Sequence, residues 1–471
     1  MTGRGDEASA FAGDAVDFPR ISTGNAEADL ILHGGFPCNS INIVMGQPGT
    51  GKTIFAEQLL FHNANQGRPL VYLTTLSEPL SKVVSYAQRL RFFDVNAIGS
   101  SVVYEDLGGE LGASGVETLV PRITDIIKRQ SPAIIIIDSF KAVHDLAEST
   151  PAMRRLVSDL AGVLSAYEVT AFLLGEYTLE QVQSYPEFAV ADSIIQLERE
   201  TLGVRDERYF RVLKLRGSGY LEGQHAFRIG AKGLRIFPRL VTPSFRSYSP
   251  LLERTTSGID GLDAMIGGGL WRGSTTLLAG PTGSGKTTMG LQFALEARRY
   301  GAPALFVNFQ ENPSQLQRLL RSLGVDPEDA ASHGFHHLYT SPVELQIDSI
   351  IVDIFRHIEA RGVRRVVIDA VGDLITAASN PQRLHDFMYS LVQHFVVRNV
   401  TSLLNFESAS GVTASDDAEQ RWSYMSDNVF VLERATTGAG ERTLRVIKTR
   451  NSEHDPTPHR IEIRDSGVRV L

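Results

Sequence analysis

The sequence predicts an α/β fold in which two tandem halves each contain a mainly parallel central sheet flanked by helices. Three observations predict this class. The motif G-x-x-x-x-G-K-[ST] occurs at residues 46–53 and again at residues 280–287, which lie 234 positions further along the chain. Stretches typical of strands and of helices alternate in the same order in both halves, as in parallel sheets. Two almost continuously apolar runs, ending at Asp138 and Asp369, are typical of strands buried on both faces.

Each motif lies between a predicted strand and a predicted helix, which is the context that a phosphate-binding loop requires. The strands are expected over residues 41–45 and 275–279, and each ends at the first glycine of its motif. The helices are expected over residues 53–66 and 287–300, and a glycine follows each of them. Strand, phosphate loop and helix therefore occur twice in the same order.

The correspondence continues through the rest of each half. Second strands are expected at 69–74 and 303–308, and helices follow them at about 79–92 and 313–323. The apolar strands come next at 134–138 and 366–369, and further strands at 170–174 and 400–404. Each half closes with strand segments, at 191–194 and 213–217 in the first and at 426–429 and 446–450 in the second. We expect these closing segments to finish the sheet with antiparallel strands.

The organisation along the chain follows from the repeat. Residues 1–17 are rich in glycine, alanine and aspartate and are expected to be disordered. Residues 18–237 and 253–471 are the two predicted domains. Residues 238–252, which contain three prolines among serines, are the predicted linker.

Composition excludes several classes of protein. Of 471 residues, 42% are hydrophobic and 21% are charged, which is typical of a globular protein. The net charge is −8 and the sequence has no run of Lys or Arg, so it does not indicate a surface that binds nucleic acid. No apolar stretch is long enough to span a membrane and no signal peptide precedes the first domain, so a cytoplasmic location is expected. Cys38 is the only cysteine and is expected to be a small apolar side chain near a strand.

The two motifs contain the residues that a nucleoside triphosphate site requires. Glycines let the backbone approach closely, so that successive N–H groups surround the phosphate oxygens. Lys52 and Lys286 are expected to contact the β- and γ-phosphates. The expected ligands of Mg²⁺, directly or through water, are Thr53, Asp138, Thr287 and Asp369. The expected nucleotide-binding residues are Gly46, Gly49, Thr50, Gly51, Lys52 and Thr53, and Gly280, Gly283, Ser284, Gly285, Lys286 and Thr287.

Hydrolysis also requires a carboxylate that orients or deprotonates the attacking water. The end of the second strand is the natural position for it. In the second half this position offers Glu311, which together with Lys286 forms the predicted catalytic pair. The aligned position of the first half is Ser77, and Glu78 follows one place later. We therefore expect the two sites to be unequal catalysts.

The arrangement resembles the KaiC family, the ATPases and autokinases of bacterial clock systems. The resemblance rests on the two phosphate loops, each preceded by a Gly-Gly pair, and on the segments LKLRG at 213–217 and SGIDGLD at 257–263. It covers nearly the whole chain from about Phe18. It implies two RecA-like P-loop domains that bind ATP and Mg²⁺.

The resemblance also implies a homohexamer of two stacked rings with ATP at each subunit interface. Residues from one subunit would then reach the nucleotide of its neighbour and neutralise charge on the γ-phosphate. The residues implied for this role are Lys214, Arg216, Lys448 and Arg450. A KaiB-like or other signalling protein is an implied partner. KaiC proteins extend beyond the position matched by Leu471 into the tail that binds the activator KaiA, so no KaiA-like partner is expected.

KaiC proteins have two adjacent glutamates after the second strand of each domain, where this sequence has Leu76-Ser77 and Gln310-Glu311. We expect the first ring to bind ATP but to hydrolyse it poorly unless Glu78 substitutes. The family's phosphoacceptor hydroxyls fall on Ser423 and Tyr424, with tyrosine in place of the usual threonine. The equivalent residues of the first domain, Phe188 and Ala189, carry no hydroxyl.

The leading interpretation is a signalling or timing ATPase with serine/threonine-type autokinase activity in its second domain. An ATP-stabilised scaffold with little turnover is an alternative, because nucleotide bound only to the assembly would stabilise it by mass action. A DNA recombinase or helicase motor is another, because RecA-like folds also form those machines. The motor predicts turnover stimulated by DNA and a basic loop.

Overall fold

The chain forms two compact units. The computed structural model describes residues 19–64, 67–76, 80–202, 205–244, 248–249, 251–296, 299, 301–378, 380–408, 422–434 and 441–471. The first unit ends at Arg239 and the second begins at Leu240. The predicted N-terminal segment 1–17 lies outside the described residues. Between Phe237 and Arg254 the described residues contain no helix or strand.

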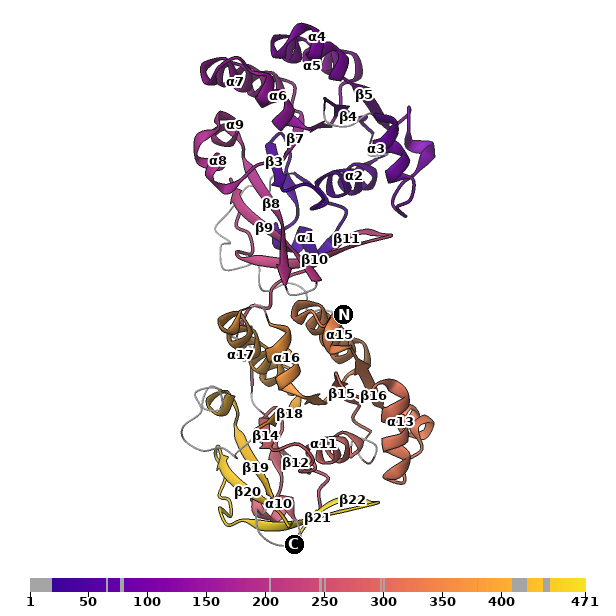
Figure 1. The fold of residues 1–471 in the computed structure, drawn as a ribbon, viewed down its shortest axis with the longest axis vertical. Helices are drawn as coiled ribbons and strands as arrows, with labels where there is room; N and C mark the ends of the chain where they lie inside the picture. The colour runs from indigo at the N-terminus through magenta and orange to yellow at the C-terminus, as the bar shows by residue number, and fades with distance from the viewer. Residues whose placement is uncertain are drawn as a thin grey trace. The chain divides into compact units, whose positions relative to one another are not determined.

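A nine-stranded sheet forms the centre of the first unit within the described residues, in the order β11-β10-β9-β8-β3-β7-β6-β4-β5 (Figure 1). Strands β5 to β8 and their neighbours β3 and β4 run parallel, whereas β9, β10 and β11 are antiparallel. A small sheet, β1-β2, accompanies it. The strands are β1 (Arg20–Ile21), β2 (Phe36–Pro37), β3 (Ile41–Gly46), β4 (Leu70–Thr74), β5 (Val102–Asp106), β6 (Ile134–Asp138), β7 (Thr170–Gly175), β8 (Ser193–Leu202), β9 (Arg205–Leu215), β10 (Gln224–Gly230) and β11 (Gly233–Phe237).

Helices cover both faces of this sheet. One core joins the sheet to α1 and α2, and the other joins it to α5, α6 and α7 (Figure 1). The helices are α1 (Ala26–Ile31), α2 (Lys52–Asn63), α3 (Leu80–Ala87), α4 (Gly108–Ser114), α5 (Leu119–Gln130), α6 (Phe140–Leu146), α7 (Thr150–Ala166), α8 (Leu179–Ser184) and α9 (Pro186–Val190).

The second unit repeats this topology, in the order β16-β15-β17-β18-β14-β19-β20-β21-β22. Its strands are β12 (Arg254–Thr255), β13 (Leu270–Trp271), β14 (Thr275–Gly280), β15 (Ala304–Asn308), β16 (Phe335–Tyr339), β17 (Arg365–Asp369), β18 (Thr401–Glu407), β19 (Asn428–Arg434), β20 (Arg442–Thr449), β21 (His459–Arg464) and β22 (Gly467–Val470). Its helices are α10 (Leu262–Met265), α11 (Lys286–Leu295), α13 (Pro313–Ser322), α14 (Pro327–Ser332), α15 (Ile347–Arg361), α16 (Val371–Ala377) and α17 (Pro381–Val397).

The apolar runs explain why both faces of each sheet are covered. Successive side chains of β6 enter opposite cores: Ile134 and Ile136 pack toward α2, and Ile135 and Ile137 pack toward α5 to α7. All four are buried, and each contributes about 1.5–3 kcal/mol to folding. The predicted α/β class with two parallel-sheet units is therefore confirmed.

Among the parallel strands of the two large sheets, two have no counterpart among the predicted elements. β5 and β16 form the parallel edges of the two sheets, paired with β4 and β15. Their sequences, VVYED and FHHLY, mix polar and apolar residues and are largely half-buried. Such edge strands lack the continuous apolar pattern that marks the central ones.

The position of the single cysteine agrees with the sequence-based expectation. Cys38 is half-buried and packs against the first core beside β2, as expected.

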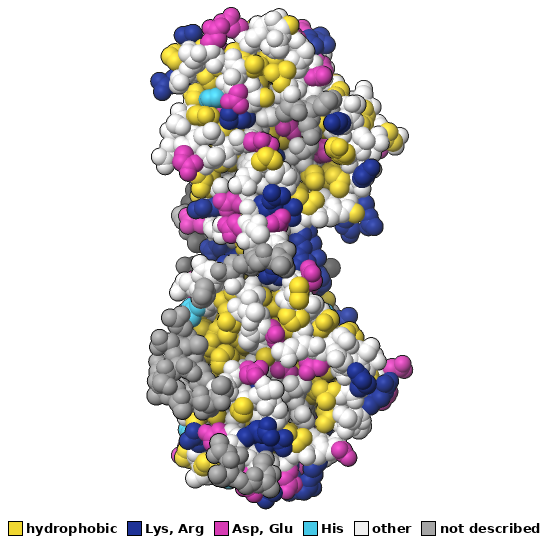
Figure 2. All heavy atoms as spheres, viewed as in Figure 1, with side chains coloured by type: hydrophobic (Ala, Val, Ile, Leu, Met, Phe, Trp, Pro, Cys, Tyr) yellow, Lys and Arg dark blue, Asp and Glu magenta, His cyan; other side chains and the backbone are white. Residues whose placement is uncertain are grey.

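Among the residues that the structure describes, no helix is both long and apolar enough to cross a bilayer. On the face drawn in Figure 2, acidic and basic side chains are interspersed over the described part of both units.

Candidate functional site

The phosphate loops lie at the carboxyl ends of the parallel strands in both units. β3 leads into α2, which begins at Lys52, and β14 leads into α11, which begins at Lys286. Neither helix has a side chain that caps its N-terminus, so its first amides are available to an anion. Burial lowers the pKa of both lysines, and nearby carboxylates partly oppose the shift: Glu176 and Asp138 for Lys52, and Glu407 and Asp369 for Lys286.

The last glycine of each motif is required by the fold itself. Gly51 and Gly285 have φ of 99° and 108°, in the left-handed region that favours glycine. A methyl group at either position would come within 3 Å of an isoleucine, Ile229 on β10 or Ile463 on β21. The antiparallel strands thus pack directly against the loops and hold them in place.

In the first unit, Asp138 already has hydrogen-bond donors. Asp138 ends β6, and its Oδ2 accepts hydrogen bonds from Thr53 Oγ1 at 2.8 Å and from Tyr72 Oη at 2.6 Å. Tyr72 is fully buried, and burial raises its pKa well above the usual value, with the Asp138 charge adding to the shift. The tyrosine therefore stays protonated and donates to the carboxylate.

In the second unit, the equivalent aspartate is less well satisfied. Asp369 is 7% exposed, and its Oδ2 accepts no hydrogen bond of ordinary geometry from the described residues. Burial raises its pKa, although the nearby side chains of Asn405 and Thr287 oppose the shift. Phe306 occupies the place of Tyr72 and has no hydroxyl. A buried carboxylate oxygen with an open position beside a threonine fits a hydrated Mg²⁺ ion.

Glu311 lies in the short connection between β15 and α13, and one buried side chain holds it. Asn308 Nδ2 donates to Glu311 Oε2 at 2.9 Å and to the Glu311 carbonyl oxygen at 3.0 Å. Asn308 Oδ1 is 2.7 Å from His337 Nε2 on β16. Because a carboxylate only accepts, the amide nitrogen faces Glu311, and the proton must be on His337 Nε2. Burial lowers the pKa of His337 to about 4, so the ring is neutral at neutral pH.

The first unit offers no described equivalent of this arrangement. Ser77 and Glu78 lie outside the described residues. Thr74 occupies the place of Asn308, and its Oγ1 instead donates to Asp106 at 3.3 Å. Next to Glu311, Gln310 Nε2 donates to Asp373 at 3.2 Å, so the residue at the position of the family's first glutamate contacts α16.

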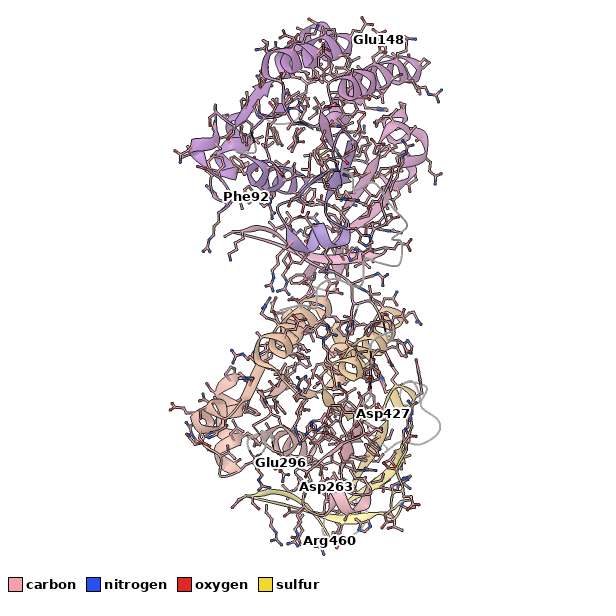
Figure 3. All side chains as sticks on the ribbon, turned by 180° about the vertical axis from the view of Figure 1, so that it is seen from behind. Phe92, Glu148, Asp263, Glu296, Asp427 and Arg460 are labelled. Carbon is pink, nitrogen blue, oxygen red and sulfur yellow. The ribbon has the colours of Figure 1, made fainter. Side chains whose placement is uncertain are left out.

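The basic residues of the closing strands lie at matching positions in the two units. Lys214 donates to the Phe188 carbonyl oxygen at 3.3 Å, and Lys448 donates to the carbonyl oxygens of Ser423 and Ser426 at 2.9 and 2.8 Å. Arg216 pairs with Asp192 at 3.5 Å in the first unit. Arg450 pairs with Asp427 at 3.6 Å, at the start of β19 (Figure 3), and donates to the Tyr424 carbonyl oxygen at 2.9 Å.

A single helical turn before β19, at residues 422–425, carries both predicted phosphoacceptors. Ser423 is half-buried, and Tyr424 is 47% exposed with its hydroxyl 2.7 Å from His385 Nε2. The first unit has α9 at this position. There Glu187, which is fully buried, lies 2.9 Å from His144 Nδ1. The turn with hydroxyls is thus specific to the second unit, as the sequence comparison of the halves indicated.

Two further pairs of charged residues border the phosphate loops, and the sequence analysis missed them. Glu176, just after β7, is 3.9 Å from Lys52, and Glu407, at the end of β18, accepts a hydrogen bond from Thr282. A methyl group at Gly49 would be 3.7 Å from Arg199 Nη1, and one at Gly283 would be 3.9 Å from Arg434 Nη1. The repeat itself could have indicated them, because the same residue type, a glutamate or an arginine, occurs at matching positions of the two halves.

Comparison with known proteins agrees with this geometry. The model of the KaiC family of ATPases matches residues 21–241 and again residues 255–471. The circadian clock oscillator protein KaiC of Picosynechococcus sp. is 26% identical over 462 residues, which cover 94% of this chain and 87% of that protein. The KaiC proteins of Acaryochloris marina and Synechococcus elongatus are 27% and 25% identical, covering 97% and 94% of this chain and 89% and 87% of those proteins. The chain therefore belongs to the KaiC family of ATPases.

Proposed function

We propose that this chain is an ATPase that assembles on binding ATP, with turnover in the second unit and mainly structural binding in the first. The observation that carries the proposal is the contrast between the two sites. Glu311 is held by Asn308 in the second unit, whereas Asp138 of the first unit is already bonded to Thr53 and Tyr72. A signalling or timing role is consistent with the names of the relatives, which are circadian clock oscillator proteins, and a KaiB-like partner is part of the proposal.

The proposed chemistry uses groups at the carboxyl edge of the second sheet. The amides of α11 and the Lys286 ammonium bind the phosphates of ATP and neutralise negative charge on the oxygens. Glu311 accepts a proton from a water molecule, whose oxygen attacks the γ-phosphorus. The bond from the γ-phosphorus to the bridging oxygen breaks, and ADP and inorganic phosphate leave. Asn308 holds the Glu311 carboxylate during this step.

Magnesium would be held by Thr287 and Asp369 in the second unit and by Thr53 and Asp138 in the first. When bound, the ion neutralises charge on the β- and γ-phosphate oxygens. The fit is supported by the open, buried Oδ2 of Asp369. In the first unit, the hydroxyls of Thr53 and Tyr72 both donate to the corresponding oxygen, Asp138 Oδ2. At least one of these hydrogen bonds must be replaced when the hydrated ion binds.

The closing strands are proposed to complete the nucleotide sites between subunits of a homohexamer. Arg216 and Arg450 are exposed, with side-chain accessibilities of 55% and 51%, and Lys214 and Lys448 lie beside them. Because Lys448 and Arg450 also donate to backbone carbonyl oxygens of the turn that carries Ser423 and Tyr424, this turn is proposed to lie near the same nucleotide as the two cations. Autophosphorylation is proposed there, with the hydroxyl oxygen replacing water as the attacking group.

Size-exclusion chromatography with and without Mg·ATP, followed by intact-mass analysis, tests the proposal. We expect a shift from a smaller species to a hexamer when Mg·ATP is present, and a mass increase of one phosphoryl group that maps to Ser423 or Tyr424. A hexamer that releases no inorganic phosphate in a parallel turnover assay would instead favour the scaffold. A monomer in both conditions would contradict the proposed assembly, and an unmodified turn would contradict the autokinase.

Tyr72→Phe tests the difference between the two metal sites. The change removes the 2.6 Å hydrogen bond to Asp138 and leaves that half-buried carboxylate oxygen with the hydrogen bond from Thr53 alone among the described residues. We expect the nucleotide-free chain to lose about 1–3 kcal/mol of stability, and saturating Mg·ATP to restore most of it because waters of the ion then satisfy Oδ2. Thermal unfolding of wild type and variant, each with and without Mg·ATP, measures this difference.

The reciprocal variant Phe306→Tyr is the matched control, since it places a hydroxyl near Asp369. It is expected to reduce the stabilisation that Mg·ATP confers on the second unit. An equal loss of stability for Tyr72→Phe in both conditions would show that the tyrosine has no part in the metal site.

A further inference from the structure

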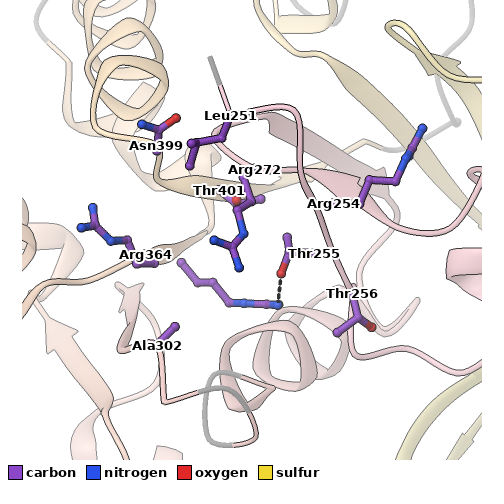
Figure 4. A pocket seen from close by; sticks show the side chains of 10 residues that line it. Leu251, Arg254, Thr255, Thr256, Arg272, Ala302, Arg364, Asn399 and Thr401 are labelled. Carbon is purple, nitrogen blue, oxygen red and sulfur yellow. Dashed lines mark hydrogen bonds between the residues drawn. The ribbon is translucent and has the colours of Figure 1, made fainter. Parts of the chain in front are cut away.

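A cavity in the second unit lies at the amino ends of the parallel strands, whereas the phosphate loop lies at their carboxyl ends. It has a volume of about 390 Å³ and borders the residues at which β17 and β18 begin (Figure 4). Asp369 ends β17, so the length of that five-residue strand, roughly 13–17 Å, separates the cavity from the candidate nucleotide site. Four of the ten residues that line the cavity are arginines, and none is acidic.

One of these arginines has a structural role that the first unit shares. Arg254 donates to the carbonyl oxygens of Ile266 and Gly269 and to Ser452. Arg20 makes the same set of contacts in the first unit, to Leu32, Gly35 and Ser218. We therefore assign Arg254 a structural role. The arginines that remain available to a ligand in the cavity are Arg272, Arg364 and Arg365.

The other three arginines are specific to the second unit. Arg365 begins β17 at the position of Ile134 on β6, and Arg364 matches Ala133. Arg272, which follows β13, matches Cys38 in the first unit. The buried Ile134 thus takes the place of Arg365 in the first unit, where Arg68, at the position of Ala302, donates to the carbonyl oxygens of Ser131 and Pro132.

Charge at this position is costly to folding, because a guanidinium loses its hydration when it is buried. Arg365 is 3% exposed, and it donates to Thr255 Oγ1 at 2.6 Å and to the Phe293 carbonyl oxygen at 3.1 Å. These contacts orient its guanidinium at the cavity wall. Arg272 pairs with Glu253 at 3.0 Å, but both side chains are at least half exposed, and Arg364 donates to the Arg398 carbonyl oxygen.

Asn399 also lines the cavity. Asn399 Oδ1 is buried and has no hydrogen-bond partner among the described residues. Asn399 lies in the turn before β18 with a φ of 52°. Because that oxygen exposes almost no surface to solvent, a ligand in the cavity does not reach it, and Asn399 is not among the residues that we assign to ligand binding.

We propose that this cavity binds a small phosphate-bearing molecule at a site separate from both ATP sites. Arg272, Arg364 and Arg365 contact the phosphate oxygens, because the planar guanidinium matches phosphate with two parallel hydrogen bonds. The volume lies within the range of about 300–1,000 Å³ that is usual for small-molecule sites.

The test is a calorimetric titration of the full-length chain with inorganic pyrophosphate in excess Mg²⁺. The protein is first saturated with a non-hydrolysable ATP analogue, so that both phosphate loops are occupied. We expect pyrophosphate to bind the wild type and to bind the double variant Arg272→Ala/Arg364→Ala about 30-fold more weakly. Both side chains are substantially exposed, and Arg364→Ala installs the residue of the first unit, so the variant is expected to fold; thermal unfolding checks this.

The matched control is Arg356→Ala/Arg460→Ala, which removes the same charge from α15 and β21, outside the cavity. We expect it to weaken pyrophosphate binding by less than about threefold, since it changes only the long-range electrostatic potential at the cavity. Absence of pyrophosphate binding to the nucleotide-saturated wild type would overturn the proposal. Equal weakening in the two double variants would also overturn it.

Discussion

Lys286→Ala is expected to remove most of the ATP turnover of the chain, whereas Lys52→Ala leaves most of it. Removing one charged contact to the reacting phosphate slows chemistry by about 100-fold or more. The loss is expected to fall on the second unit because Glu311 is held there by Asn308. Steady-state phosphate release with saturating Mg·ATP measures turnover, and ATP binding to each variant measures the occupancy of the remaining site.

The two lysine variants are controls for one another. Both lysines begin a helix after the phosphate loop and both are buried, so their replacement perturbs the fold similarly. For Lys52→Ala we expect weaker assembly in Mg·ATP, measured by size-exclusion chromatography, with turnover per assembled subunit retained. If turnover vanished only with Lys52→Ala, the division of roles between the two units would be wrong.

Glu311→Gln is expected to lower kcat by about 100-fold or more, because the amide cannot accept the proton of the attacking water. Asn308→Thr, which installs the residue of the first unit, is expected to lower kcat by about tenfold with little change in KM. The threonine cannot donate to Glu311 as the amide does, so the carboxylate is present but no longer held. Steady-state kinetics separates the effects on kcat and KM.

Thr74→Asn, the reciprocal exchange in the first unit, is the matched control and is expected to leave turnover unchanged. Because Asn308 is fully buried, thermal unfolding of each variant is measured as well. A rise in KM with constant kcat for Asn308→Thr would assign the residue to ATP binding. Unchanged kinetics for Asn308→Thr would mean that its bond to Glu311 has no part in turnover.

Much of the fold could be predicted from the sequence, because the central strands are apolar on both faces. The strand at 134–138 has the same bounds in the structure, and the strand predicted at 366–369 begins one residue earlier, at Arg365. That difference has a physical cause, because an arginine at the start of a buried strand carries no apolar signal. The edge strands β5 and β16 were missed because only part of each is buried.

The candidate site was predictable where a motif specifies both the residue and its position. The structure brings Lys286, Asp369 and Glu311 to one edge of the sheet, as the positions after parallel strands require. Asn308 and His337 could not be predicted, because their role depends on contacts between two neighbouring strands whose pairing the sequence did not reveal. The same applies to Tyr72, whose hydroxyl reaches Asp138 across the pair β4 and β6.

If the turn is phosphorylated as proposed, the contacts of Lys448 would give the second unit a means of limiting its own chemistry. Its ammonium donates to the carbonyl oxygens of Ser423 and Ser426, so its position depends on that turn. A phosphoryl group on Ser423 would bring nearly two negative charges next to Lys448 and Arg450. Both cations would then be drawn toward the modified turn and away from a neighbouring nucleotide. Each phosphorylation event would thereby slow the next one, which is negative feedback built from two side chains and a short turn.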